Sequence, residues 1–126
     1  MFPELKREMT SNATVYQWRR KYVRENKSKL CPTLTANMGT GGHNVPLILT
    51  SYGIRKLTPK ECFMIQGFDT TFELPDEVAN SHLYKQAGNS VVVPVIRRIA
   101  KSIMSAINLE EPISKDSGII TLNDFS

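Results

Sequence analysis

The chain has 126 residues and a formal net charge of +4, with 16 Lys and Arg against 12 Asp and Glu. This length allows one small domain or a fragment of a larger one, because domains commonly contain roughly 100–200 residues. No apolar run approaches the ~20 residues that span a bilayer. The two cysteines and two histidines lie too far apart for the usual zinc-ligand spacings. We therefore expect neither a membrane segment nor a metal site.

The positive charge is concentrated in the first 30 residues, which hold eight Lys or Arg and three Glu, whereas residues 109–126 are acidic. A basic segment attracts polyanions such as nucleic acid, because binding releases the counterions around the phosphates. A solvated surface of the same charge is the alternative interpretation. With two cysteines and no secretory leader, we expect a cytoplasmic, nucleoid-associated protein.

The first predicted elements are a flexible lead-in over residues 1–14, which are polar and show no hydrophobic period, and a strand or extended segment over 15–24. The second segment interleaves aromatic and cationic side chains and partly alternates. It could stack on bases and clamp phosphates. Alternatively, it is an edge strand with Tyr16 and Trp18 in the core.

Two short strand-like runs, residues 31–36 and 44–50, flank the glycine-rich stretch TANMGTGGHN at 35–44. A tight hairpin loop usually needs only about two to five residues, and this loop is longer. Glycine permits positive φ angles and a close approach of the backbone to another molecule. The stretch is therefore either a structural turn or a loop that faces a ligand.

The clearest local pattern predicts a two-turn helix over residues 59–66. Thr58 can cap the helix, Pro59 suits its first position, Glu61 completes a capping box and Gly67 supplies a left-handed stop. Cys62 and Ile65 share one helix face, so Cys62 is expected in the core and not as a nucleophile.

Residues 84–90 predict a polar turn, followed by an amphipathic helix that continues to about Asn108. Isoleucines recur in this helix at three- and four-residue steps, with cations on the other side. Asn89 or Ser90 could cap it, and a turn with free backbone N–H groups at a helix start suits a small anionic or polar ligand. Capping alone would also explain these residues. Residues 109–126 predict a loosely held tail.

Three stretches, in this order, resemble the C-terminal part of a bacterial cytosine-5 DNA methyltransferase of the restriction–modification type. Pro32–Ala36 with the following glycine loop resembles the end of the family's target-recognition region. Arg55–Phe68 is similar to its ninth motif, and Tyr84–Val92 matches its tenth. The resemblance covers about residues 15–107.

The resemblance implies an α+β fragment. Residues 15–83 would form a small, irregular β recognition subdomain that includes the short ninth-motif helix. Residues 84–108 would hold the tenth motif and a C-terminal helix that belongs to a Rossmann-like, S-adenosylmethionine-dependent methyltransferase domain.

The resemblance also implies which residues meet DNA and cofactor. The Thr-Leu-Thr segment and its glycine loop would bring short side chains and backbone against base edges in the major groove, while nearby cations would mostly meet phosphates. The expected DNA-binding residues are Arg19, Arg20, Arg24, Lys27, Thr33, Leu34, Thr35, Asn37, Gly39, Gly41, Gly42 and Arg55. The expected residues at the S-adenosylmethionine site are Gln86, Gly88, Asn89 and Ser90.

The family's other motifs do not occur in this sequence. They are the Phe-x-Gly-x-Gly cofactor loop, the Pro-Cys nucleophile loop, the Glu-Asn-Val acid and the Gln-x-Arg-x-Arg motif. The chemistry needs a thiolate that attacks a flipped cytosine and an acid near its N3. We therefore expect no catalytic residue in this chain, and we expect its partners to be duplex DNA and a catalytic half on the same longer chain or on a separate subunit.

The leading hypothesis is thus the recognition and C-terminal portion of a cytosine-5 methyltransferase, inactive by itself. The alternative is a stand-alone DNA-binding module or an inactive remnant. The exposed isoleucine face of the last helix favours the first, because a solitary domain gains nothing from it. A metal- or phosphate-binding enzyme built on the glycine loop is a weak third hypothesis, because the sequence around the loop matches no phosphate-binding motif.

Overall fold

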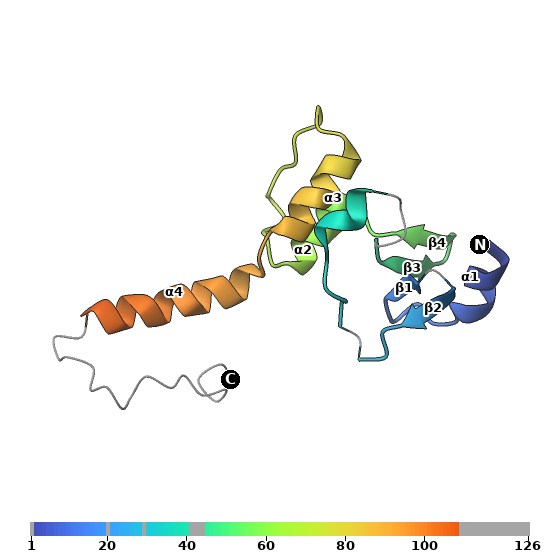
Figure 1. Ribbon diagram of the computed structural model, residues 1–126, viewed down its shortest axis with the longest axis horizontal. Coiled ribbons are helices and arrows are strands. Elements are labelled where there is room, and N and C mark those ends of the chain that lie inside the picture. The colour runs from blue at the N-terminus through green and yellow to red at the C-terminus, as the bar shows by residue number, and fades with distance from the viewer. Residues whose placement is uncertain (1, 20, 29, 41–44, 109–126) are drawn as a thin grey trace. The chain divides into compact units, whose positions relative to one another are not determined.

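The computed structural model describes residues 2–19, 21–28, 30–40 and 45–108 (Figure 1). The chain divides into two compact units, Met1–Val93 and Pro94–Ser126. The first contains helix α1 (Phe2–Glu8), strands β1 (Tyr16–Arg19) and β2 (Tyr22–Glu25), the 3-10 turn η1 (Ala36–Gly39), strands β3 (Leu47–Thr50) and β4 (Gly53–Lys56), and helices α2 (Pro59–Ile65) and α3 (Asn80–Asn89). Helix α4 (Val93–Asn108) begins at the last residue of the first unit and contains all the described residues of the second.

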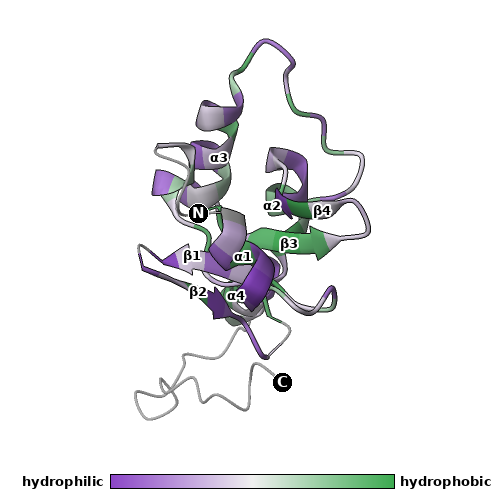
Figure 2. Cartoon of the chain, turned by 90° about the vertical axis from the view of Figure 1, so that its right-hand side faces the viewer, coloured by the Kyte–Doolittle hydropathy of each residue, from purple (hydrophilic) through white to green (hydrophobic). Residues whose placement is uncertain are grey.

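The four strands form one antiparallel sheet in the order β2-β1-β3-β4. Two hairpins, β1–β2 and β3–β4, are joined where Tyr16 pairs with Leu47. The hydrophobic strand β3 lies inside the sheet, and Figure 2 shows its apolar character. This small sheet with helices confirms the predicted α+β character, with the predicted single strand over 15–24 replaced by a hairpin.

One core lies between the sheet and α1. Its buried side chains are Leu5, Met9, Tyr16 and Leu47, with Trp18 packed against them. The Tyr16 side chain is 0% exposed, and its hydroxyl oxygen accepts hydrogen bonds from the backbone N–H groups of Thr10 and Ser11 at 3.2 and 2.9 Å. Residues 2–8 therefore differ from the predicted flexible lead-in. The helix depends on tertiary contacts through two apolar side chains, too few to give a period in the sequence.

A second core joins α2, α3, η1 and the start of β3, and contains Met38, Val45, Leu57, Cys62, Phe63 and Ala87. The predicted helix over 59–66 is confirmed as α2, one residue shorter. Thr58 and Glu61 form the capping box, and Gly67 has a φ of 85°. Cys62 is 0% exposed, as expected for a core residue, whereas Ile65 on the expected shared face is 44% exposed.

Two predicted local structures differ from the structure. Residues 30–35 contain no strand and lead into η1, because they pair with no strand of the sheet. Residues 84–89 belong to helix α3 and not to a polar turn. This helix buries Leu83 and Ala87, and the Tyr84 hydroxyl donates to the Leu57 carbonyl oxygen at 2.6 Å. Packing thus overrides the turn signals of Gly88 and Asn89.

Helix α4 extends to Asn108, the end predicted from its period. It begins at Val93, so neither Asn89, the last residue of α3, nor Ser90, which caps the C-terminal end of α3, starts it. None of its residues is buried, and Val95, Ile96, Ile99, Ile103, Met104 and Ile107 are all exposed. The two units divide after Val93, directly beyond the stretch Tyr84–Val92 where the sequence predicts the tenth motif. Among the residues that the structure describes, no helix is long and apolar enough to cross a membrane.

Candidate nucleic-acid interface

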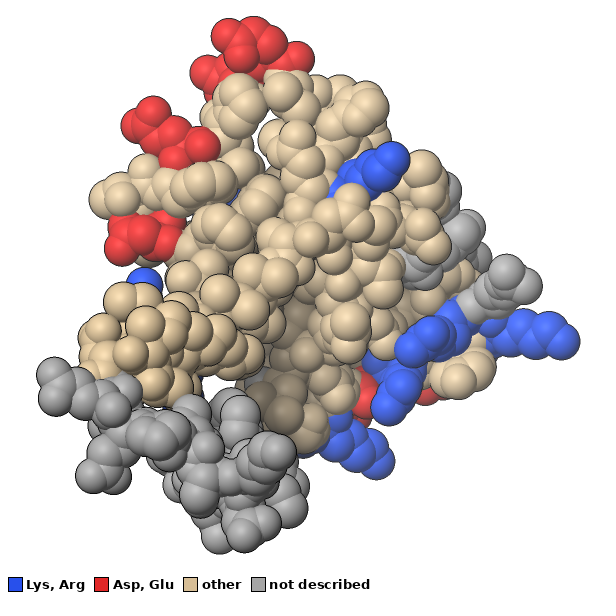
Figure 3. All heavy atoms as spheres, turned by 60° about the vertical axis from the view of Figure 1, so that its left-hand side comes forward, with Lys and Arg blue, Asp and Glu red and all other residues tan. Residues whose placement is uncertain are grey.

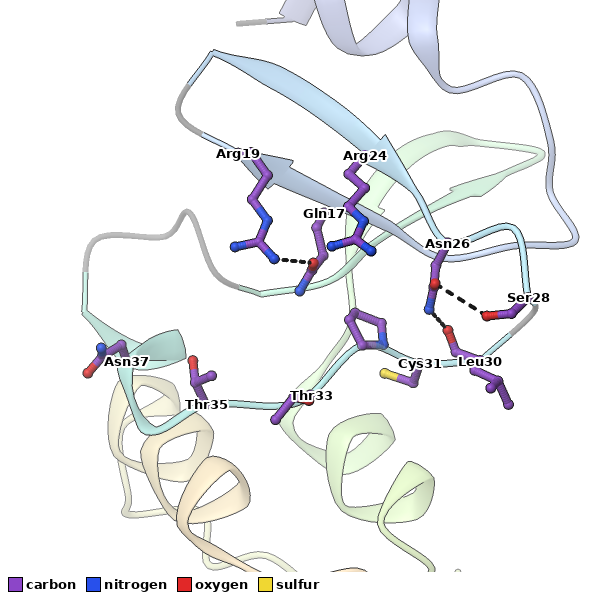
Figure 4. A pocket seen from close by; sticks show the side chains of 11 residues that line it. Gln17, Arg19, Arg24, Asn26, Ser28, Leu30, Cys31, Thr33, Thr35 and Asn37 are labelled. Atoms are coloured by element: carbon purple, nitrogen blue, oxygen red, sulfur yellow. Dashed lines mark hydrogen bonds between the residues drawn. The ribbon is translucent and has the colours of Figure 1, made fainter.

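The candidate interface is an open groove of about 540 Å³ between the β1–β2 hairpin and residues 30–37 (Figure 4). Its lining brings together Arg19, Arg24, Thr33, Thr35 and Asn37, five residues predicted to bind DNA. Gln17, Asn26, Ser28, Leu30, Cys31 and Pro32 complete it. Among the described residues that line the groove there are two arginines and no carboxylate.

One wall is a face of the hairpin. Gln17 pairs with Arg24 and Arg19 with Tyr22 across the two strands. Because successive side chains on a strand point to opposite faces, these four residues share one face, and Tyr16, Trp18 and Val23 share the other, which packs on the core. Figure 4 shows Gln17, Arg19 and Arg24 pointing toward the segment that carries Thr33 and Thr35.

Asn26 connects the hairpin to the opposite wall. Its backbone N–H donates to the Val15 carbonyl oxygen at 2.9 Å, and its own carbonyl oxygen accepts from the Thr14 hydroxyl at 2.6 Å. Its side-chain Nδ2 donates to the carbonyl oxygen of Leu30. The turn after β2 is thereby tied to the start of the 30–35 segment, which fixes where Thr33 and Thr35 stand relative to the arginines.

The opposite wall is held from behind by α3. A β-carbon at Gly88 would come within 2.2 Å of the Thr35 carbonyl oxygen, and one at Gly39 within 2.0 Å of the Ser81 carbonyl oxygen. Both glycines are thus required by the contact between η1 and α3. Gly39, predicted to face DNA, has a packing role and does not line the groove.

Two further predicted DNA-binding residues do not line this groove. Leu34 packs against the second core, and Lys27 is exposed on the turn after β2. Arg20, Gly41 and Gly42 lie outside the described residues.

Arg55, which was predicted to contact phosphate, is held by a carboxylate. Its Nη1 and Nη2 donate to Glu61 Oε2 and Oε1 at 2.8 and 2.7 Å, while Glu61 Oε2 also accepts from Thr58 N. The Arg55 guanidinium, together with the Thr58 backbone, lowers the pKa of Glu61 to about 2 despite partial burial. Arg55 therefore supports the start of α2 through the capping carboxylate.

Two groups of exposed charged side chains stand out in the first unit. Four cations lie on the hairpin and its following turn (Arg19, Lys21, Arg24 and Lys27), and four acids lie in the loop between α2 and α3 (Asp69, Glu73, Asp76 and Glu77). On the face shown in Figure 3, several Asp and Glu side chains gather at one end, and most of the visible Lys and Arg side chains gather at the other, where acidic side chains lie among them. The four hairpin cations favour a polyanion on the groove side.

A second groove, of about 580 Å³, lies on the other side of the 30–34 segment and contains two of the four predicted cofactor residues, Gly88 and Ser90. Gln66, which sequence reasoning missed, donates from Nε2 to the Ala87 carbonyl oxygen at 2.5 Å and to the Ser90 hydroxyl at 3.0 Å. The lining also includes Leu34, Ile65 and Val92. Gln86 and Asn89 are exposed and do not line it.

Neither cysteine is arranged as a nucleophile. Burial raises the pKa of the Cys62 thiol to about 12, and burial also raises the pKa of Cys31. A reactive cysteine requires the opposite, a thiolate stabilised near neutral pH. Cys31 lies in the wall that the two grooves share.

Comparison with known proteins agrees with the resemblance to a cytosine-5 DNA methyltransferase. The family model of the C-5 cytosine-specific DNA methylase matches residues 2–105. The Type II methyltransferase M.Bsp6I of Bacillus sp. (strain RFL6) is 69% identical over 106 residues, which are 84% of this chain and 33% of that protein. M.SsoII of Shigella sonnei is 38% identical over 76 residues, 60% of this chain and 20% of that protein.

A phage protein is also similar. The orphan methyltransferase M.Rho11sI of Bacillus phage rho11s is 49% identical over 63 residues, 48% of this chain and 12% of that protein. The chain thus spans a third or less of the length of these relatives. No solved structure matches it.

Proposed function

Because the chain belongs to the family of C-5 cytosine-specific DNA methylases, we propose that it is the DNA-recognition and C-terminal portion of a restriction–modification DNA (cytosine-5)-methyltransferase. The complete enzyme transfers a methyl group from S-adenosylmethionine to cytosine in duplex DNA. This chain supplies the DNA-binding groove, and the catalytic thiolate comes from the part of the enzyme that lies outside it. Such a protein acts in the bacterial cytoplasm, at the nucleoid.

The observation that carries this proposal is the first groove. It combines two arginines, three amides and short hydroxyl side chains on two walls, which are the groups that contact phosphates and base edges. Lys27 lies just outside the groove, where it meets phosphate. In this proposal Arg55 acts on DNA only indirectly, because its guanidinium is held by Glu61.

The second groove suits S-adenosylmethionine and forms one wall of a larger cofactor site. The lining combines apolar side chains with Ser90 and Gly88, a combination that suits a ligand with an aromatic base and polar groups. When bound, this cofactor supplies the methyl group. The role of the chain is to hold the cofactor from one side, with Gln66 fixing the position of Ser90.

The partner is the catalytic part of the enzyme, and helix α4 is the surface that contacts it. Six large apolar side chains are exposed along this helix, and exposed apolar surface of this kind marks an interaction site. Whether the catalytic part is continuous with this chain or a separate subunit does not change the chemistry of the contact.

A complex-formation experiment distinguishes this proposal from a stand-alone module or an inactive remnant. The part of M.Bsp6I outside the matched segment is purified and mixed with this chain, and the complex is measured by analytical ultracentrifugation. We expect a one-to-one complex that the Ile103→Glu variant loses, while the exposed Lys101→Glu variant keeps it. Absence of a complex with the wild-type chain, together with unimpaired duplex binding, would support the stand-alone module.

A further inference from the structure

The hairpin wall of the groove carries a defined set of hydrogen-bonding groups. Gln17, Arg19 and Arg24 share the face that turns away from the core. Within the part of the chain that the structure describes, no carboxylate pairs with either guanidinium. Both guanidinium groups line the groove together with the Gln17 amide.

The contact between Arg19 and Gln17 fixes the orientation of the amide. Arg19 Nη2 donates to Gln17 Oε1 at 3.1 Å, and a guanidinium can only donate. One lone pair of the Gln17 oxygen is therefore engaged, and the Nε2 amino group is turned away from Arg19, as Figure 4 shows. Both donors of the Gln17 amide remain available, beside the second lone pair of its oxygen.

The face is therefore rich in donors. Both arginines donate and cannot accept, and Gln17 adds two donors beside the oxygen that binds Arg19. In the major groove, guanine offers two adjacent acceptors, N7 and O6, whereas adenine and cytosine each place an amino donor there. The two guanidinium groups match the acceptors of guanine and meet the amino groups of adenine and cytosine donor to donor.

We propose that the Gln17–Arg19 pair and Arg24 read guanine edges in the major groove and are not phosphate contacts. The proposal rests on the function proposed above, since it requires that this groove receive duplex DNA. A two-stranded β-ribbon is narrow enough to enter the major groove. The β1–β2 hairpin is joined to the rest of the sheet at the Tyr16–Leu47 pair, where β1 begins, and one of its faces packs on the core. Arg19 acts on Gln17 as a positioning residue and also has donors of its own for the base.

The test uses this chain and a pool of duplexes with a randomised central segment, at one fixed salt concentration because salt alone changes affinity. Bound duplexes are sequenced for the wild type and for three variants. Gln17→Glu replaces the donor amide by an acceptor, Arg24→Lys keeps the charge but loses the planar fork, and Lys27→Gln removes a charge outside the groove. Urea unfolding, followed by the fluorescence of Trp18, verifies that each variant folds.

We expect the wild-type chain to select guanine at defined positions. Gln17→Glu and Arg24→Lys should each lower the preference for guanine at one position by on the order of 10- to 100-fold. Lys27→Gln should weaken the binding of all duplex sequences alike. If both groove variants bind more weakly but select the same sequences, these residues contact phosphates and the inference is overturned, with the proposed function intact. If the wild-type chain binds no duplex, the proposed function fails as well.

Discussion

Gly88 of α3 lies directly against the backbone of Thr35, so closely that a β-carbon at position 88 would stand 2.2 Å from both the Thr35 carbonyl carbon and its oxygen. This contact joins the two candidate sites. Thr35 lines the first groove and Gly88 the second. The helix that carries the predicted cofactor residues is therefore also the support for the wall that faces DNA.

Replacing Gly88 by alanine should destabilise the chain. Alanine in a helix is normally more stable than glycine by about 0.8–1 kcal/mol, so propensity alone predicts a gain. The clash with the Thr35 backbone predicts a loss of about 1–3 kcal/mol, as for other overpacked sites. Urea unfolding measures the change in unfolding free energy, and its sign decides between the gain and the loss. The Asn89→Ala variant, at the adjacent exposed position, is the control. A gain in stability for Gly88→Ala would contradict the close contact.

The Tyr16 hydroxyl should contribute to the packing of the N-terminal segment. Tyr16→Phe leaves the N–H groups of Thr10 and Ser11 without their acceptor, which should cost about 1–3 kcal/mol of unfolding free energy. Tyr22 has the same side chain but is 61% exposed, so Tyr22→Phe should change stability by less than about 0.5 kcal/mol. Equal effects of the two substitutions in urea unfolding would show that α1 is not anchored through Tyr16.

The Arg55–Glu61 pair predicts a pH dependence of stability. The pKa of Glu61 is about 2 in the folded chain, below the value of about 4.3 for an unperturbed glutamate. A lowered folded pKa stabilises the fold above the unfolded pKa, and this contribution is lost as the pH falls from about 4.3 to about 2.

Glu61→Gln should abolish this part of the pH profile, because the amide does not titrate. Thr58→Ala removes the cap hydroxyl and should lower stability by about 1 kcal/mol at all pH values. The measurement is the urea midpoint across the pH series. An unchanged acid-side slope in Glu61→Gln would show that the ion pair does not stabilise the fold.

The two cysteines should react at very different rates. Cys62 is buried and has a pKa of about 12, so almost no thiolate is present at pH 8 and no reagent reaches it. Cys31 is partly exposed in the groove wall. We expect a chromogenic disulfide reagent to modify one thiol in the folded chain and a second only in urea, and duplex DNA to slow the first reaction. The Cys31→Ser variant, used to assign the signal, should show no reaction when folded, and a reactive Cys62 would contradict the core placement.

Helix α2 could be predicted from the sequence because its signals are local. The start of this helix is specified by the cap Thr58, by Pro59 and by Glu61, and its end by Gly67. The structure places all four as expected. Helix α3 could not be predicted in the same way. Its sequence contains Gly88 and Asn89, which locally favour a turn, and only the contact of Gly88 with Thr35, far away in the sequence, explains the glycine.

The candidate site was predictable only where its signals are local. Charge and the family resemblance identified Arg19, Arg24, Thr33, Thr35 and Asn37, which the structure brings into one groove. Gln17 was missed, because its place in the groove depends on the hairpin register that sets it opposite Arg24. Arg55 carries the same charge as the groove arginines, and only the structure reveals that Glu61 engages it.

The most direct test of the account is methyl transfer by a chimeric enzyme in which this chain replaces the matched segment of M.Bsp6I. Transfer from labelled S-adenosylmethionine to duplex DNA of mixed sequence is measured for the chimera, for this chain alone and for M.Bsp6I itself. The account predicts transfer by the chimera and none by the chain alone. A folded chimera without activity beside an active M.Bsp6I would contradict it, and so would transfer by the chain alone.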